Sequence, residues 1–201
     1  MGRTRAAILE AAAGCFAQHG VRKTTMGDIA VAGAIAKATL YNHFRAKDDV
    51  LGALVESRVA AFAHDGVELA RRDGLAAALV LVAEALASDP ALRMVACTEA
   101  PLLLPLAVPG DGRGWASARA GVLAVLQAAG RRDDQHGVEV ILRWLAAQVL
   151  WPAEPGQARF AAGLLDAGLA ATGLAATGLE ATGLAADRAP APAGTAVGWP
   201  G

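Results

Sequence analysis

Residues 25–44 contain two short helical patterns separated by a break, and this arrangement constrains the fold more than any other feature of the chain. The first pattern opens at Thr25, which Asp28 follows at the spacing of a capping box, with Asp in place of the more common Glu. It predicts a helix over about 26–33. After the break, the run KATLYNH predicts a second short helix over about 37–43.

A longer amphipathic helix is expected before these two. Ile8, Ala12 and Phe16 recur at helical spacing over residues 3–19, and Gly20 provides a C-terminal stop. A long helix followed by two short ones around a tight turn is the layout of a helix-turn-helix domain. The same spacing also fits any small helical bundle, so the pattern alone leaves both open.

The composition favours an all-α fold for the whole chain. Of 201 residues, 55% are hydrophobic and only 4% aromatic, and alanine and leucine, both strong helix formers, dominate the apolar set. The two cysteines, Cys15 and Cys97, have no metal-binding spacing and suit a reducing cytoplasm. The N-terminal residues lack the apolar run of a signal peptide.

Basic residues are concentrated at the N-terminus. Residues 1–47 carry seven basic and two acidic side chains, whereas the remainder carries eleven basic and seventeen acidic ones. A basic head on an acidic body indicates contact with a polyanion such as a nucleic acid, although chance clustering of surface charge gives the same count.

The predicted helix over 37–43 has two different sides. Leu40 and Phe44 lie one turn apart and form an apolar stripe that is expected to pack on the first helix. Thr39 and His43 share another side, where small and polar neighbours would let the helix enter a DNA major groove and reach bases and phosphates. Such a short helix offers no cleft for catalysis.

These residues resemble the tetracycline-repressor (TetR) family of bacterial transcription regulators. The resemblance rests on Ile8, Ala12, Phe16, Gly20, TTMGDIA and above all KATLYNHFRAKDDVLGAL, and it covers residues 3 to about 54. It implies a three-helix head whose third helix enters the major groove. Tyr41, His43 and Lys47 are then expected to hold phosphates with help from Thr25, while Lys37, Ala38 and Thr39 face bases. The full predicted DNA-binding set is Thr25, Ala36, Lys37, Ala38, Thr39, Tyr41, Asn42, His43 and Lys47.

The chain departs from the family pattern at three places. Gly33–Ala34 stands where the family usually has Ala-Gly, and alanine costs roughly 1 kcal/mol at position 34 if the turn needs a positive φ there. Ala36 and Ala46 stand where the family often has a residue able to cap the following helix, so both helix starts are expected to lack a side-chain cap.

The remaining sequence predicts a helical body and a tail. We divide the chain into a DNA-binding domain (1–47), a ligand-binding and dimerisation domain (48–170) and a low-complexity, disordered tail (171–201). Body helices are expected from 47 to beyond 60 and over 74–87, 91–100, 115–129, 137–151 and 155–170, with a Pro/Gly-rich loop over 102–114. By resemblance, 137–151 and 155–170 form a homodimer interface, and the middle helices enclose a cavity for a small-molecule effector.

Candidate ligand-binding residues are harder to choose. Met94, Cys97, Trp115, Arg119 and Trp144 are the candidates, although tryptophans in such helices are more often ordinary core residues. A cavity with few polar groups suggests an apolar effector.

The tail repeats leucine every five residues, which places successive leucines about 140° apart around a helix, so they form no continuous seam. Recurrent glycines weaken the helix further. A membrane span is the alternative, but Asp166 and Glu180 interrupt the run and its residues are poor lipid-facing material, so no membrane contact is expected.

Taken together, the sequence predicts a cytoplasmic, ligand-responsive transcription regulator. It would bind a palindromic double-stranded DNA operator as a homodimer, act as a repressor and be released by a small apolar effector. No catalytic residue, metal site or cofactor is predicted, because the four histidines are scattered and no catalytic or phosphate-loop motif occurs. The alternative is a helical dimer that binds small molecules but not DNA.

Overall fold

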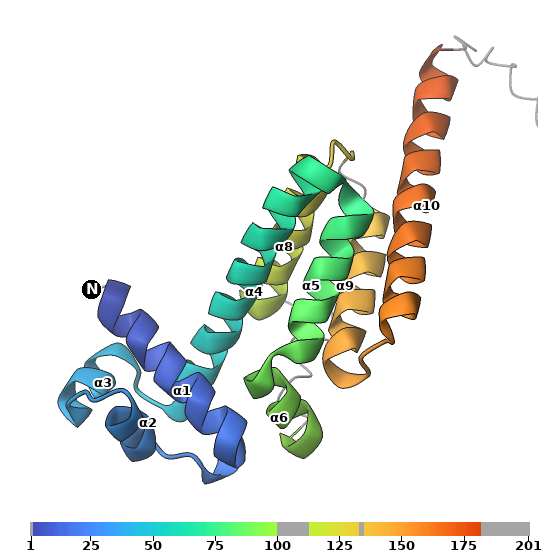
Figure 1. Ribbon diagram of the computed structural model, residues 1–201. Coiled ribbons are helices and arrows are strands. Elements are labelled where there is room, and N and C mark those ends of the chain that lie inside the picture. The colour runs from blue at the N-terminus through green and yellow to red at the C-terminus, as the bar shows by residue number, and fades with distance from the viewer. Residues whose placement is uncertain (1, 100–112, 133–134, 182–201) are drawn as a thin grey trace, which may run out of the picture.

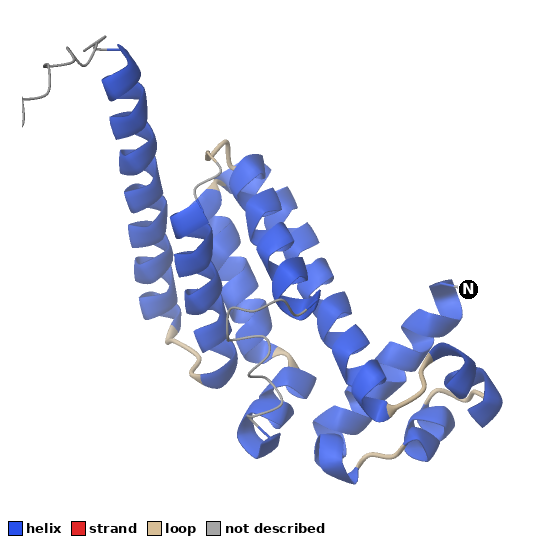
Figure 2. Ribbon diagram, turned by 180° about the vertical axis from the view of Figure 1, so that it is seen from behind, coloured by secondary structure: helices blue, strands red, loops and turns tan. Residues whose placement is uncertain are grey.

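The computed structural model describes residues 2–99, 113–132 and 135–181. Every regular element in these ranges is an α-helix, which confirms the predicted fold class (Figure 1; Figure 2). The helices are α1 (Gly2–Lys23), α2 (Met26–Ala32), α3 (Lys37–His43), α4 (Lys47–Asp73), α5 (Leu75–Ser88), α6 (Pro90–Glu99), α8 (Arg113–Ala128), α9 (Gln135–Leu150) and α10 (Pro155–Ala181). The expected loop over 102–114 lies outside the described residues up to 112, and its last two residues begin α8.

The first three helices form a small head at one end of the molecule, and α10 lies at the other end (Figure 1). Gly20 interrupts α1 with φ 75° and ψ 166°, a conformation that glycine adopts without the strain of a Cβ, so the predicted stop is a kink within the helix. The bounds of α3 match those expected from the sequence.

The turn between α2 and α3 explains why this chain has Gly33–Ala34. A Cβ added at Gly33 would lie 3.2 Å from the Ile29 carbonyl oxygen and 3.3 Å from the Ala11 Cβ, so glycine allows α2 to approach α1 closely. Ala34 then takes φ 49°, which makes it the one non-glycine residue with positive φ in the described ranges. The strain anticipated at position 34 is therefore present.

A long helix joins head and body. The first turns of α4 pack into the head, and the rest runs along α8 and α5 (Figure 1). The head also rests on α6 through α1. Since α4 contributes to both parts, the domain boundary at residue 47 stays a prediction.

The buried apolar residues form two clusters. The head cluster joins α1, α2 and α3 to the start of α4 and to α6, and it includes Ile8, Phe16 and Leu40. The body cluster joins α5, α8 and α9 to parts of α4 and α10. Phe62 and Leu86 pack against both clusters, so the two cores meet at these side chains.

The last helix is longer than predicted, because α10 continues to Ala181 and does not end near residue 170, while the assignment of a separate tail stays a prediction. The absence of an apolar seam was taken to prevent a helix, but the high intrinsic propensity of alanine and leucine extends a helix already anchored on the body. Residues 182–201 lie outside the described part of the chain.

No single described helix is both long and apolar enough to cross a membrane, although α5 and Pro90–Thr98, bent by 61° to each other, meet the length and composition criteria as a pair.

Replacing Ala34 with glycine should stabilise the protein by about 1 kcal/mol, because it removes the left-handed strain at an exposed position. Urea unfolding followed by circular dichroism measures the change. Ala32→Gly is the matched control: it places glycine in the neighbouring helix and should give no gain. An unchanged or lower stability of Ala34→Gly would contradict the assigned strain.

Candidate functional site

The inner side of α3 anchors the helix in the head. Leu40 is fully buried and Phe44 is 5% exposed, and both belong to the head cluster with Ile8 and Phe16. The Arg5 guanidinium lies 5.4 Å from the centroid of the Phe44 ring, a cation–π distance that adds a contact from α1. The predicted packing of the apolar stripe on the first helix is therefore present.

This anchoring leaves the opposite side of α3 in solvent. Tyr41 is 52% exposed, Thr39 and His43 are half-buried, and the remaining predicted contact residues on this side are exposed: Ala36, Lys37, Ala38 and Asn42. As expected, Ala36 and Ala46 precede their helices without contributing a side-chain hydroxyl cap. A narrow helix with small and polar outward side chains can enter the major groove of a duplex.

Thr25 and Asp28 form the predicted capping box at the start of α2. The Thr25 hydroxyl accepts from the Asp28 N–H at 3.2 Å, and both the hydroxyl and the N–H of Thr25 donate to Asp28 Oδ2 at 2.8 Å. Hydrogen bonds from Thr25 lower the pKa of the Asp28 carboxyl. The bond from the backbone N–H has the larger effect and the bond from the hydroxyl the smaller one. In the structure Thr25 therefore caps α2, and its contact with DNA stays a prediction.

Lys47 also has partners inside the head. Its ammonium donates to the carbonyl oxygens of Val21 at 2.6 Å, Thr24 at 3.0 Å and Arg22 at 3.3 Å. All three donors of the ammonium thus close the C-terminal end of α1, where carbonyls would otherwise lack helical partners. The sequence gives no sign of this role, because the partners lie more than twenty residues away.

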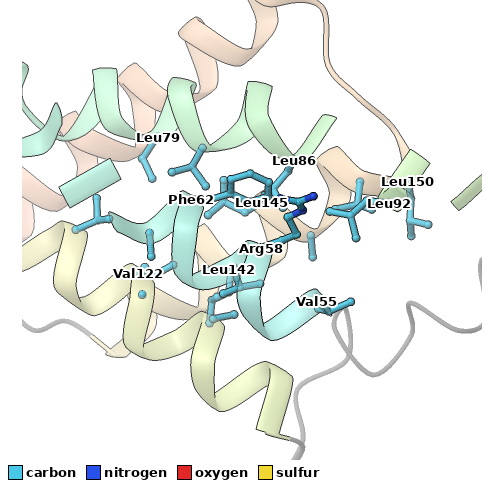
Figure 3. Close-up of a pocket in the computed structure, with 18 residues that line it drawn as sticks. Val55, Arg58, Phe62, Leu79, Leu86, Leu92, Val122, Leu142, Leu145 and Leu150 are labelled. Atoms are coloured by element: carbon cyan, nitrogen blue, oxygen red, sulfur yellow. The ribbon is translucent and has the colours of Figure 1, made fainter. Parts of the chain in front are cut away.

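A cavity of about 100 Å³ lies in the body, bounded by α4, α5, α6, α8 and α9 (Figure 3). Its walls are alanine, glycine, valine, leucine and phenylalanine apart from one arginine, Arg58. The lining residues are Val55, Arg58, Val59, Phe62, Ala63, Leu79, Val82, Leu86, Leu92, Ala118, Gly121, Val122, Val125, Leu142, Leu145, Ala146, Val149 and Leu150.

None of the five residues predicted to bind ligand lines this cavity. Met94 is half-buried and Cys97 exposed on α6, Arg119 pairs with Glu139 at 2.7 Å, and Trp115 and Trp144 pack in or against the body cluster. The two tryptophans pack as core residues, which is the alternative named in the sequence analysis. Ligand binding by the five residues stays a prediction. They were selected as polarisable or charged side chains, whereas this cavity is lined mainly by small aliphatic ones.

Large apolar side chains are exposed along α9 and α10. Val140 is 49% exposed, Phe160 70% and Leu164 58%, and Trp151, directly after α9, is 83% exposed. These are the helices expected to form the homodimer interface. In the described ranges, no group of three His, Cys, Asp or Glu side chains is placed to hold a metal ion.

A solvent-facing polar helix held on a basic head and joined to a helical body is the arrangement of a helix-turn-helix DNA-binding protein. Residues 8–54 match the model of the bacterial regulatory proteins of the tetR family. The match covers the head and the start of α4, so the chain resembles the tetR family in this part.

Known relatives agree in the head, and solved structures agree in the fold. The transcriptional regulator TtgR of Pseudomonas putida is 41% identical over 54 residues, which cover 27% of this chain and 26% of TtgR. The fatty acid degradation regulator FadR from Bacillus halodurans superimposes with a TM-score of 0.63 at 20% identity, over 83% of this chain and 96% of FadR. The TetR family repressor AlkX from Dietzia sp. gives 0.62 at 20% identity, over 82% and 94%. The chain thus spans about a quarter of the length of the curated relative, and similarity beyond the head is one of fold.

Two lysines of the head should respond differently to loss of charge. Lys47→Met should destabilise the protein by about 1–3 kcal/mol, because it leaves helix-terminal carbonyls without their charged donor. Lys37→Met removes an exposed lysine and should change stability by less than about 0.5 kcal/mol. Urea unfolding of both variants measures the difference, and equal stabilities would show that Lys47 does not close α1.

Proposed function

We propose that this protein is a transcription regulator that binds a palindromic DNA operator as a homodimer and leaves it when a small apolar molecule enters the cavity. The observation that carries the proposal is the outward polar side of α3, presented by the buried anchors Leu40 and Phe44. The match of residues 8–54 to the tetR family model supports it independently.

The DNA-contacting roles follow from exposure and chemistry. Lys37 lies at the N-terminal end of α3, the end that reaches base edges in helix-turn-helix complexes, and its ammonium can donate to guanine. Tyr41 and His43, further along the helix, can donate to phosphate oxygens. Asn42 is exposed beside them. Thr25 and Lys47 would take part only by exchanging internal partners for phosphates.

A dimer follows from the geometry of the duplex. One head reads half of a palindrome, and two heads must be separated by about one helical turn, about 34–36 Å. The exposed apolar residues of α9 and α10 supply a surface that a second copy can cover. Single exposed hydrophobic residues are normal on a protein surface, but here three lie on α9 and α10 and a fourth directly follows α9, which favours an interface.

The cavity supports an effector that is neutral and apolar. Apart from Arg58 its walls are apolar, so a polar or charged group buried away from that residue would be left unpaired. Apolar cavities of similar size stay dry and accept small hydrocarbons such as benzene. Binding that favours a conformation with misplaced heads would lower operator affinity by linkage.

Footprinting on the DNA upstream of the chain's own coding region tests the proposal. A regulator should protect a two-fold symmetric site, and its affinity should fall steeply as salt rises, because neutralised phosphates release counterions. Protection without symmetry would reject the dimeric mode. No binding at low salt would favour the alternative, a helical dimer that binds small molecules only.

Substitutions on α3 should distinguish residues that contact bases from residues that contact phosphates. Lys37→Ala should cost about 1–3 kcal/mol of operator affinity and relax the preference for one base pair. Tyr41→Phe should weaken binding to all sequences about equally, by about 1 kcal/mol, because it removes one hydroxyl donor. Electrophoretic mobility shifts on a set of single-base operator variants measure both. Arg71→Ala, which removes a positive charge far along α4, is the control and should leave affinity unchanged.

The dimer surface can be tested without DNA. Phe160→Glu should shift the protein to monomer in analytical ultracentrifugation, because it buries a charge in an apolar interface. Val31→Glu places the same charge at an 80% exposed apolar position on α2 and should leave the dimer intact. A dimer that persists in Phe160→Glu would place the interface elsewhere.

A further inference from the structure

The cavity lies where the two hydrophobic clusters meet. Val55 and Leu92 of its wall belong to the head cluster, and Leu79 belongs to the body cluster. Phe62 and Leu86, which pack against both, also line it (Figure 3). A molecule in the cavity therefore touches side chains of both cores at once.

Arg58 connects this wall to the DNA-binding head. It lies on α4 among the cavity residues (Figure 3), and its guanidinium makes a two-point contact with Glu10 of α1: Nη1 lies 3.1 Å from Oε1 and Nη2 3.1 Å from Oε2. Its Nε lies 3.2 Å from Oδ2 of Asp89, an ion pair without hydrogen-bond geometry. One side chain thus links the cavity wall, α1 of the head and the corner between α5 and α6.

Asp89 extends the connection to α6. Its carboxylate is 8% exposed, and Oδ1 accepts from the N–H of Leu92 at 2.9 Å, which caps the start of α6. Leu92 in turn lines the cavity, and α6 carries the contact between body and α1. A buried carboxylate that loses its cationic partner is strongly destabilised, so Arg58 and α6 depend on each other.

The charges of Arg58, Glu10 and Asp89 favour a neutral ligand that displaces the guanidinium sterically over an anionic ligand that binds to it. Arg58 brings one positive charge, while Glu10 and Asp89 bring two negative ones. An anionic ligand would meet net negative charge at this end of the cavity, because both Nη atoms of Arg58 contact Glu10 and its Nε faces Asp89. A neutral occupant instead acts by filling the space beside the aliphatic part of the arginine.

We propose that Arg58 transmits occupancy of the cavity to the DNA-binding head: an apolar ligand displaces its guanidinium from Glu10 and loosens α1 from α4 and α6. This rests on the proposed function of the cavity as the effector site. Arg58 is a positioning residue, since it acts on the DNA-reading helix through Glu10 and α1. A two-point arginine–carboxylate contact suits this role because it has two discrete states, made and broken.

Hydrogen exchange of the full chain, with benzene as the probe, tests the proposal without DNA. In the wild type, benzene should slow exchange in peptides of α4, α5, α8 and α9 around the cavity. It should also speed exchange around Glu10 in α1 by about five-fold or more, the lower range of allosteric coupling. Peptide-level mass spectrometry reports both regions in one experiment.

Two variants and one control isolate Arg58. Glu10→Gln removes the charge of a 66% exposed carboxylate, so the fold should persist, α1 should exchange faster without benzene, and benzene should add nothing there. Arg58→Lys keeps the charge but loses the two-point contact and should behave in the same way. Glu68→Gln breaks the ion pair to Arg71 on the same helix, away from the cavity, and should respond like the wild type.

Each result decides the proposal. Protection around the cavity with a response in α1 that is lost only in Glu10→Gln and Arg58→Lys supports it. Protection with no response in α1, or with an equal response in Glu10→Gln, overturns it and leaves the effector site standing. No protection around the cavity in the wild type rejects both this inference and the cavity as effector site, while DNA binding by α3 remains to be judged by footprinting.

Discussion

Burial of Leu40 and Phe44 against α1 is the contact on which the rest of the head depends. These two side chains fix which way a seven-residue helix faces, and a helix that short has little stability of its own. Once they are buried, the other side of α3 must face solvent, and it carries Lys37, Tyr41 and Asn42. The same packing requires the tight approach of α2, which Gly33 permits and Ala34 accommodates under strain.

The head gains further support from residues whose type suggests DNA contact. Lys47 closes α1, and Thr25 with Asp28 closes the start of α2. Both are polar groups at the surface of a basic domain, and both have internal partners. A positive or hydroxylated side chain near the recognition helix therefore cannot be assigned to DNA from its type alone, and free donors such as those of Lys37 and Tyr41 are stronger candidates.

The body is built so that its cavity borders the head. The head cluster extends into α4 and α6, and the empty space lies where that cluster meets the body core. Arg58 is the charged side chain in the cavity wall, and its partners are on α1 and at the start of α6. The cavity wall and α1 of the head are thereby linked through one side chain, although α1 and α4 carry its two ends at positions distant in sequence.

Sequence patterns were sufficient to predict features that depend on residues close together in the chain. The limits of α3 and the capping box at Thr25 follow from residues within a few positions of one another. The strain at Ala34 was instead predicted from the departure from the family pattern. The cavity could not be predicted, because it is a gap left by small side chains of five helices. Arg58 was missed because Glu10 lies 48 residues away, and α10 was underestimated because helix propensity compensates for a missing apolar seam.

Tyr41 is the single tyrosine of the chain, which allows α3 to be observed directly. Protein labelled with 3-fluorotyrosine should give one ¹⁹F resonance, and adding the footprinted upstream DNA should shift it, while an unrelated duplex at higher salt should not. A protein that binds the upstream DNA with an unmoved resonance would contradict the assignment of α3 as the DNA-reading helix.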